Sequence, residues 1–396
     1  MTANAMLSDL SAIGRTTRGG YTRLAWDDAT MQLREWFAGQ ASATGLEVVE
    51  DGNGNQLAWL GDGSADGRKA LMLGSHLDSV RDGGPLDGPL GVAASLSALN
   101  RLLASGWNPT RPIVIANFSD EEGGRFGVAC LGSRLATGAS PADATLALRD
   151  DDGTTLAEVM TARGRDPRSA GPAEWLDRIA CFVELHVEQG RWLEPHGAAV
   201  GVASAIWPHG RYRLDFCGQG NHAGATAMTD RRDPMLTYAA TVLAARELAA
   251  GGDRATFGRV QVAPGSTNSI PSRVTAWLDA RAEAEPALEA LVGAIVQRAE
   301  TAARTDGTSV TLTAESTSGA VDFDLPLRHR LGALLDAPVL ATGAGHDAGV
   351  LAARLPTAML FVRNPSGISH APEEFAEPID IDAGVDALVR VIEELG

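Results

Sequence analysis

The side chains best suited to chemistry in this sequence are histidines and carboxylates that directly follow short apolar segments. His76 and Asp78 follow the apolar residues 70–74, and Asp87 lies in a glycine-rich segment just beyond them. A neutral imidazole is a good ligand for Zn²⁺ or Mn²⁺, and a carboxylate has two oxygens with which it can bridge two ions. Asp78 could orient a metal-bound histidine. A histidine and an aspartate two residues apart are, on their own, more often structural.

Three acidic residues stand together after a second apolar segment: Asp120, Glu121 and Glu122. Like charges repel, so such a run is costly without a cation, although a solvated loop is the common alternative. One glutamate could bind a metal ion while its neighbour serves as general base. His186 and His370 each follow a further apolar segment. A lone histidine at such a place is more often a hydrogen-bonded core residue.

The elements that must position these residues are predicted from four short apolar segments that end abruptly in polar residues, at 70–74, 112–117, 181–183 and 356–362. Each is predicted to be a buried strand followed by a polar loop. Helices such as 90–104 are expected between them, which favours an α/β fold with a mainly parallel sheet and flanking helices. Ligands of such sheets bind beyond the carboxyl ends of the strands. Five metal-competent residues on four such loops therefore predict a two-metal site.

The middle of the chain has a different pattern. Strands are predicted at 211–217, 257–263, 273–281 and 308–314, and helices at 233–250 and 286–304. The order β-α-β-β-α-β is typical of a ferredoxin-like α+β domain. We therefore predict an inserted domain at residues 208–320, within a discontinuous catalytic domain formed by residues 1–207 and 321–396.

Composition narrows the class of protein. The chain has 396 residues and a formal net charge of −17, which argues against a nucleic-acid-binding surface. Its three cysteines are far apart in the sequence, so neither a disulfide framework nor a sulfur-based zinc site is expected. The N-terminus does not have the pattern of a signal peptide, and no apolar segment is long enough to cross a bilayer. A cytoplasmic protein is expected.

Several longer segments resemble the M20-type metallo-amidohydrolases, in particular the branch that contains N-carbamoyl-L-amino-acid hydrolases, β-ureidopropionase and allantoate amidohydrolase. They cover most of the chain in the family's order. The matching segments are 74–92, 119–133, 183–194, 220–234, 265–281, 343–349 and 365–374. The resemblance implies a zinc-exopeptidase-like catalytic domain and makes the inserted domain a lid and dimerisation domain.

The resemblance also implies a role for each candidate metal ligand. His76 and His186 would bind one divalent ion, Glu122 and His370 would bind the other, and Asp87 would bridge the two. Glu121 would be the general base and acid beside them. Asp78, which could orient His76, is counted with the catalytic candidates. An acidic residue usually stands at the position of His186 in related peptidases and deacylases, so this histidine points to the carbamoyl-cleaving branch.

The same resemblance assigns His222, Asn268 and Arg281 to substrate recognition, and Gln189 and His346 to the lining of the site. Arg281 could hold a carboxylate bidentately, with a surface charge as the alternative. Asn268 could donate to the same carboxylate or form a turn. His222 could polarise the scissile carbonyl, in its own subunit or in a neighbouring one.

The expected activity is hydrolysis of the ureido C–N bond of an N-carbamoyl-L-amino acid or allantoate, with release of ammonia and carbon dioxide. Carbamoyl-β-alanine and ureidoglycolate remain open as substrates, and the ligands suit Zn²⁺ and Mn²⁺ equally. The expected partners are a small ureido substrate that bears a carboxylate and, by resemblance, a second copy of the chain. The alternatives are an M20-like N-acyl-amino-acid deacylase or dipeptidase, and a metal-free binding protein on the same fold.

Overall fold

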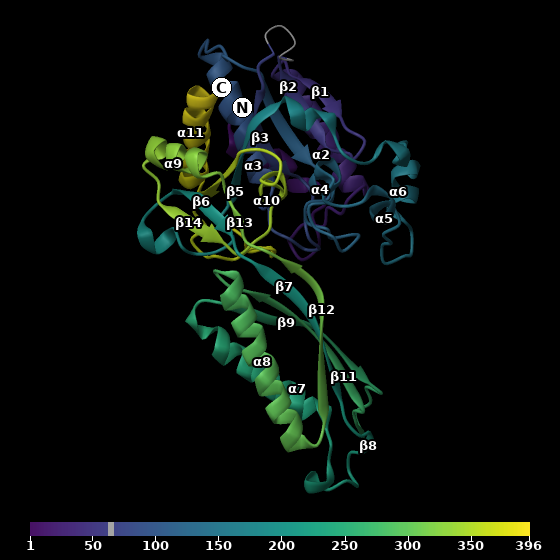
Figure 1. Ribbon diagram of the computed structural model, residues 1–396. Coiled ribbons are helices and arrows are strands. Elements are labelled where there is room, and N and C mark those ends of the chain that lie inside the picture. The colour runs from purple at the N-terminus through teal and green to yellow at the C-terminus, as the bar shows by residue number, and fades with distance from the viewer. Residues whose placement is uncertain (62–66) are drawn as a thin grey trace. The chain divides into compact units, whose positions relative to one another are not determined.

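A computed structural model describes residues 1–61 and 67–396 (Figure 1). The chain divides into two compact units. The first unit comprises Met1–Ser204 and Asp322–Gly396, and the second unit comprises Ala205–Val321. None of the described helices is both long and apolar enough to span a membrane.

Among the described residues, nine strands form the sheet of the first unit, in the order β1-β2-β4-β3-β5-β15-β6-β13, with β14 paired to β6. Their bounds are β1 Glu47–Glu50, β2 Gln56–Leu60, β3 Ala70–His76, β4 Ile113–Phe118, β5 Ile179–Val187, β6 Val200–Ile206, β13 Val321–Asp322, β14 Val339–Thr342 and β15 Thr357–Val362. The four central strands β4, β3, β5 and β15 run parallel. Strands β1, β2 and β6 pair antiparallel at the flanks. The predicted α/β sheet is confirmed, and its parallel part is the core.

The central strands are buried on both faces, which explains why they are continuous apolar segments rather than alternating ones. Every residue of β3, β4 and β15 is buried. Helices of the first unit surround this sheet (Figure 1). Their bounds are α1 Ala3–Asp9, α2 Asp28–Ala43, α3 Pro89–Ala104, α4 Leu131–Thr137, α5 Ala142–Leu146, α6 Leu156–Ala162, α9 Leu325–Leu335, α10 Asp347–Leu351 and α11 Pro378–Leu395.

Helix α3 lies directly against the sheet because its first turn contains a glycine, Gly91. A Cβ atom added at Gly91 would stand 2.2 Å from the carbonyl oxygen of Leu185 and 2.7 Å from Cβ of Ser75. These two residues belong to β5 and β3, so Gly91 permits a contact that no other residue could make without displacing a strand. The segment that precedes α3, which carries Asp87, is thereby held at the ends of both strands.

The second unit is an antiparallel sheet with two long helices. Its strands are β7 His209–Cys217, β9 Arg254–Ala263, β11 Arg273–Arg281 and β12 Ser309–Ser318, in the order β12-β7-β11-β9. Helices α7 Pro234–Leu248 and α8 Glu285–Asp306 complete the predicted ferredoxin-like order, which is confirmed. The side chain of Asp233 accepts the backbone N–H of Met235 and caps α7. A separate two-stranded ladder joins β8 Asn221–His222 to β10 Ser269–Ile270.

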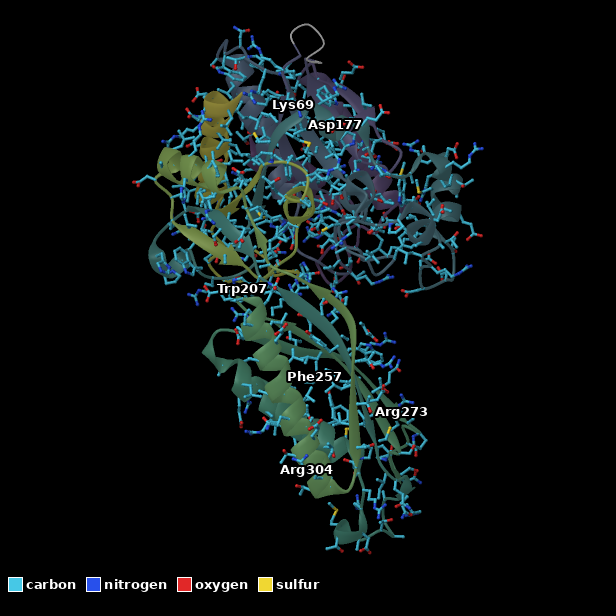
Figure 2. The ribbon with its side chains drawn as sticks, in the orientation of Figure 1. Lys69, Asp177, Trp207, Phe257, Arg273 and Arg304 are labelled. Carbon is cyan, nitrogen blue, oxygen red and sulfur yellow. The ribbon has the colours of Figure 1, made fainter. Side chains whose placement is uncertain are left out.

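The core of the second unit lies between its sheet and its helices. Leu214, Ala276 and Ile295 are fully buried there. Phe257 of β9, labelled in Figure 2, belongs to the sheet, and its ring centroid lies 5.8 Å from that of Tyr238 of α7. This unit therefore has an apolar core of its own.

Candidate metal centre

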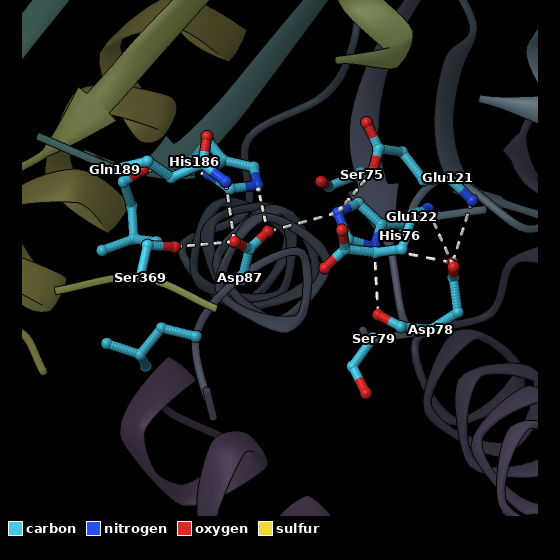
Figure 3. Close-up of polar contacts among 12 residues, drawn as sticks. Ser75, His76, Asp78, Ser79, Asp87, Glu121, Glu122, His186, Gln189 and Ser369 are labelled. Atoms are coloured by element: carbon cyan, nitrogen blue, oxygen red, sulfur yellow. Dashed lines mark hydrogen bonds and ion pairs between the residues drawn. The ribbon is translucent and has the colours of Figure 1, made fainter. Parts of the chain in front are cut away.

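The carboxyl ends of the four parallel strands bring together side chains that are far apart in the sequence (Figure 3). His76 ends β3, and His186 lies one residue before the end of β5. Glu121 and Glu122 follow β4, and His370 follows β15. Asp87 enters from the segment before α3. The five predicted metal ligands and Glu121 thus meet at one edge of the sheet.

One group of donors is fully buried. His76, Asp87 and His186 offer ligand atoms that all lie within 4.8 Å of one another, and we call this group the buried metal position. Nε2 of His186 lies 3.1 Å from Oδ1 of Asp87, and Nε2 of His76 lies 3.7 Å from the same oxygen. The group offers two imidazole nitrogens and one carboxylate oxygen, a donor set that suits zinc and manganese.

Backbone carbonyls orient both histidines of this group. Nδ1 of His76 lies 3.2 Å from the carbonyl oxygen of Asp78, and Nδ1 of His186 lies 2.9 Å from that of Val187. A neutral imidazole donates from the nitrogen that faces a carbonyl, so Nε2 carries the lone pair in each ring. Both Nε2 atoms are buried without a hydrogen-bond partner in the described part of the chain. Such lone pairs fit a divalent ion.

A second group of donors is less buried. Asp87, Glu122 and His370 also offer ligand atoms within 4.8 Å of one another, and we call this group the outer metal position. Nε2 of His370 lies 3.2 Å from Oδ2 of Asp87 and 3.4 Å from Oε2 of Glu122. Asp87 thus presents one oxygen to each position, which suits a bridging ligand. The side chain of His370 is 48% exposed, so solvent reaches this position.

Electrostatics favour a cation at the outer position. Burial, assisted by the charge of Asp87, raises the pKa of Glu122 to about 7. The hydrogen bond with Asp87 raises the pKa of His370 to about 9 despite its partial burial. Burial alone would raise the pKa of Asp87, but in the metal-free site the protonated forms of His186 and His370 outweigh it and hold this pKa well below its usual value. The carboxylates therefore attract positive charge, which a proton on His370 supplies only in part.

Glu121 lies beside the buried metal position. Its Oε1 accepts a hydrogen bond from the thiol of Cys130 at 3.3 Å, and its Oε2 lies 3.7 Å from Nε2 of His76. The carboxylate of Asp78 accepts the backbone N–H groups of Glu121 at 3.2 Å and Glu122 at 3.0 Å. Asp78 therefore joins the end of β3 to the acidic segment after β4.

The acidic run is not a solvated loop. Asp120 and Glu121 are 3% and 5% exposed, and Glu122 is half-buried. Burial raises the pKa of Glu121 well above its usual value, and the neighbouring Asp347 and Glu122 add to this effect against the opposing His76. Asp120 adopts a positive φ of 54°, which turns the chain so that both glutamates face the site. The alternative interpretation of the run as a surface loop is wrong.

Gln189 and His346 lie at this site as well. Nε2 of Gln189 donates to Oδ2 of Asp87 at 2.7 Å, so in this structure Gln189 contacts the carboxylate between the two metal positions. His346 is buried, with its ring centroid 4.4 Å from that of His186.

Sequence reasoning missed three further residues here, Cys130, Ser369 and Glu374, because their signal is a contact between segments distant in sequence.

The three remaining candidates belong to the second unit. Nδ1 of His222 accepts the backbone N–H groups of Gly224 and Ala225 at 3.1 and 3.2 Å, so in the neutral ring the hydrogen is on Nε2. The carbonyl of Asn268 accepts the N–H of Ala223, which places Asn268 beside His222. Arg281 donates to the carboxylate of Asp279, with Nε 2.8 Å from Oδ1.

Arg281 lies at the other end of the second unit from these two residues. It is the last residue of β11, whereas the β8–β10 ladder precedes the first residue of that strand. A strand rises about 3.3 Å per residue, so the ends of the nine-residue β11 lie roughly 26 Å apart. One copy of this unit therefore does not bring His222 and Arg281 to the same small substrate.

Comparison with known proteins gives consistent matches over the whole chain. The model of peptidase family M20/M25/M40 matches residues 72–394. The N-carbamoyl-L-amino acid amidohydrolase of Geobacillus stearothermophilus is 35% identical, covering 98% of this chain and 97% of that protein. The allantoate amidohydrolase of Escherichia coli (strain K12) is 31% identical, covering 98% and 95%. The crystal structure of an amidase of the hydantoinase/carbamoylase family from Burkholderia vietnamiensis matches with a TM-score of 0.86 at 31% identity, covering 99% and 96%.

Proposed function

We propose that this chain, which belongs to peptidase family M20/M25/M40, cleaves the ureido C–N bond of an N-carbamoyl-L-amino acid or of allantoate. Ammonia and carbon dioxide would be released. The observation that carries the proposal is the position of Asp87, which presents one oxygen to each of two groups of metal-competent side chains. Glu121 lies beside His76 of the buried group. The histidine at position 186, where related peptidases usually have an acidic residue, supports the carbamoyl-cleaving branch.

Two divalent ions, Zn²⁺ or Mn²⁺, would be held by His76, His186 and Asp87 at the buried position and by Glu122, His370 and Asp87 at the outer one. When bound, they would polarise the ureido carbonyl and lower the pKa of water. We propose the same role whether the bound ions are Zn²⁺ or Mn²⁺.

The side chains would move the protons. Oε2 of Glu121 would take a proton from the attacking water and return it to the leaving nitrogen as the C–N bond breaks. The thiol of Cys130 would keep the other oxygen of Glu121 engaged. Nε2–H of His222, fixed as a donor because Nδ1 accepts two backbone N–H groups, would stabilise the negative charge that develops on the carbonyl oxygen.

We further propose that residues 208–320 act as a lid and dimerisation domain on the catalytic residues 1–207 and 321–396. The roughly 26 Å between the two ends of β11 supports a homodimer, because His222 and Asn268 could serve the same substrate as Arg281 only if they came from another copy. Arg281 would hold the substrate carboxylate after exchanging its contact with Asp279.

Ammonia release tests the proposal. Metal-free protein reconstituted with Zn²⁺ or Mn²⁺ would be assayed on carbamoyl-α-amino acids, carbamoyl-β-alanine, allantoate and ureidoglycolate, with N-acetyl amino acids and dipeptides as comparison substrates. Ammonia from at least one ureido compound is expected. Turnover confined to the comparison substrates would instead identify a deacylase or dipeptidase. Absence of bound metal after reconstitution would favour a binding protein.

A further inference from the structure

The two metal positions differ in how firmly their ligands are held. At the buried position, both histidines are fully buried and each has a carbonyl at Nδ1. At the outer position, His370 is half-exposed, and its ring contacts in the described residues are Nε2 contacts with Asp87, Glu122 and Gln189. No backbone carbonyl orients this ring among the described residues. Its placement must therefore come from the backbone of its own segment, where His370 has a positive φ of 56°.

Glu374, four residues further along, ties that segment to the segment of Asp87. Its Oε2 accepts the backbone N–H groups of Leu86 at 2.8 Å and Asp87 at 3.0 Å. The carboxylate is 4% exposed and lies where only a glycine leaves room, because a Cβ atom at Gly84 would stand 2.2 Å from the same oxygen. A buried carboxylate is costly unless donors surround it, and the backbone of the Asp87 segment supplies two of them.

Ser369 extends the connection to the bridging carboxylate itself. Its hydroxyl lies 2.8 Å from Oε1 of Glu374 and 2.9 Å from Oδ2 of Asp87. A hydroxyl has one hydrogen, so it can donate to only one of the two carboxylates at a time. If an ion occupied Oδ2 of Asp87, Glu374 would still offer Ser369 an acceptor. The segment of His370 would then stay attached in both states.

We propose that Glu374 is a positioning residue for the outer metal position: with Ser369 it fixes the segment of His370 to the segment of Asp87. Metal affinity at the outer position should therefore depend strongly on Glu374. The buried position shares only Asp87 with it, and its two histidines are oriented by other groups, so its affinity should change much less. The inference rests on the two-metal site of the proposed function but not on the identity of its substrate.

Metal binding by the full chain tests this inference directly. Zn²⁺ and, separately, Mn²⁺ would be titrated calorimetrically into chelator-treated wild type, Glu374→Ala, Glu374→Gln and Ser369→Ala, with the exposed neighbour changed in Glu373→Gln as the matched control. Glu374→Ala should keep one equivalent and bind the second about 10–100-fold more weakly, as is usual when a residue behind a ligand is lost. Glu374→Gln retains an oxygen for the N–H groups of Leu86 and Asp87, so it should lose less.

The outcomes separate this inference from the proposed function. The inference would be overturned if Glu374→Ala bound the second equivalent as tightly as wild type does. Equal weakening of both equivalents together with a lower unfolding temperature of the metal-free variant would also overturn it, because that pattern belongs to a merely structural residue. If Glu374→Ala does not fold, Ser369→Ala must show the selective weakening on its own. Wild type that binds no metal would overturn both the inference and the proposed function.

Discussion

The thiol of Cys130 donates to one oxygen of Glu121 at 3.3 Å and leaves the other oxygen 3.7 Å from Nε2 of His76. The backbone N–H of Cys130 also donates to the carbonyl of Glu121. Burial raises the pKa of Cys130 well above its usual value, so the thiol keeps the hydrogen that it donates. The two hydrogen bonds from Cys130 thus fix which oxygen of Glu121 faces His76 of the buried metal position.

Replacing Cys130 by alanine should therefore lower kcat by about 10-fold while KM changes by less than about twofold, because a hydrogen bond to a charged group is lost without any loss of substrate contact. Cys130→Ser keeps a donor and should recover most of the rate. The matched control is Cys181→Ala, which removes another buried thiol and should leave kcat unchanged. A serine variant as slow as the alanine variant would contradict the prediction.

Glu121→Gln should retain both metal equivalents and lose turnover by about 10²–10⁴-fold, the usual contribution of a general base. The change keeps the shape of the side chain and removes its ability to take a proton. Steady-state rates and metal analysis of the same sample would check it. Near-normal turnover would remove Glu121 from this role.

Metal binding to the metal-free protein should release protons at pH 7. His370 has a pKa of about 9 and is mostly protonated at that pH, whereas a metal ligand must be neutral. The apparent affinity should therefore rise as the pH is raised toward 9 and level off above it. Calorimetry in two buffers of different ionisation enthalpy measures the released protons, and heats that are independent of the buffer would contradict the expected release.

Mixing two inactive variants should restore activity if the substrate residues of one site come from two copies. In dimers formed at random from Arg281→Ala and His222→Ala chains, roughly a quarter of the sites would have both residues intact. Co-refolding the two variants and assaying ammonia release would measure this. A mixture as inactive as its parts would indicate that each site uses one copy alone.

Gly91→Ala should destabilise the first unit by about 1–3 kcal/mol, because the new methyl group meets the backbone of β5 and the side chain of Ser75 on β3. Gly293→Ala, in the interior of α8, is the matched control. Nothing lies within 4 Å of the added atom there, so it should be neutral or stabilising by about 0.5–1 kcal/mol. Thermal unfolding of the metal-loaded proteins, with each transition followed separately, would distinguish the two.

The sequence predicted the central strands because burial on both faces leaves a continuous apolar segment, as in β3, β4 and β15. It did not reveal β1, whose residues alternate between exposed and half-buried, or the two-residue strand β13. Neither has enough apolar residues in a row to distinguish it from a loop.

The candidate site was also predicted only in part. Residues that could ligate a metal were visible because their side-chain types are uncommon directly after apolar strands. The contacts that hold them were not, because Glu374 reaches Leu86 across 288 positions of sequence and only the fold brings the two together. The contact of Arg281 with Asp279 was also unforeseen, since an ion pair between residues two apart on a strand has no periodic signature.

Gly84 and Gly91 stand at the two ends of the segment that carries Asp87, and each is required by a different neighbour: the carboxylate of Glu374 at one end, and the backbone of β5 at the other. The backbone between these two glycines is therefore held in place at both of its ends. A single insertion or deletion between Gly84 and Gly91 would displace one of these glycines and, with it, the carboxylate of Asp87. Length variation among natural variants should consequently be absent from residues 84–91, even where the residue types between the two glycines change.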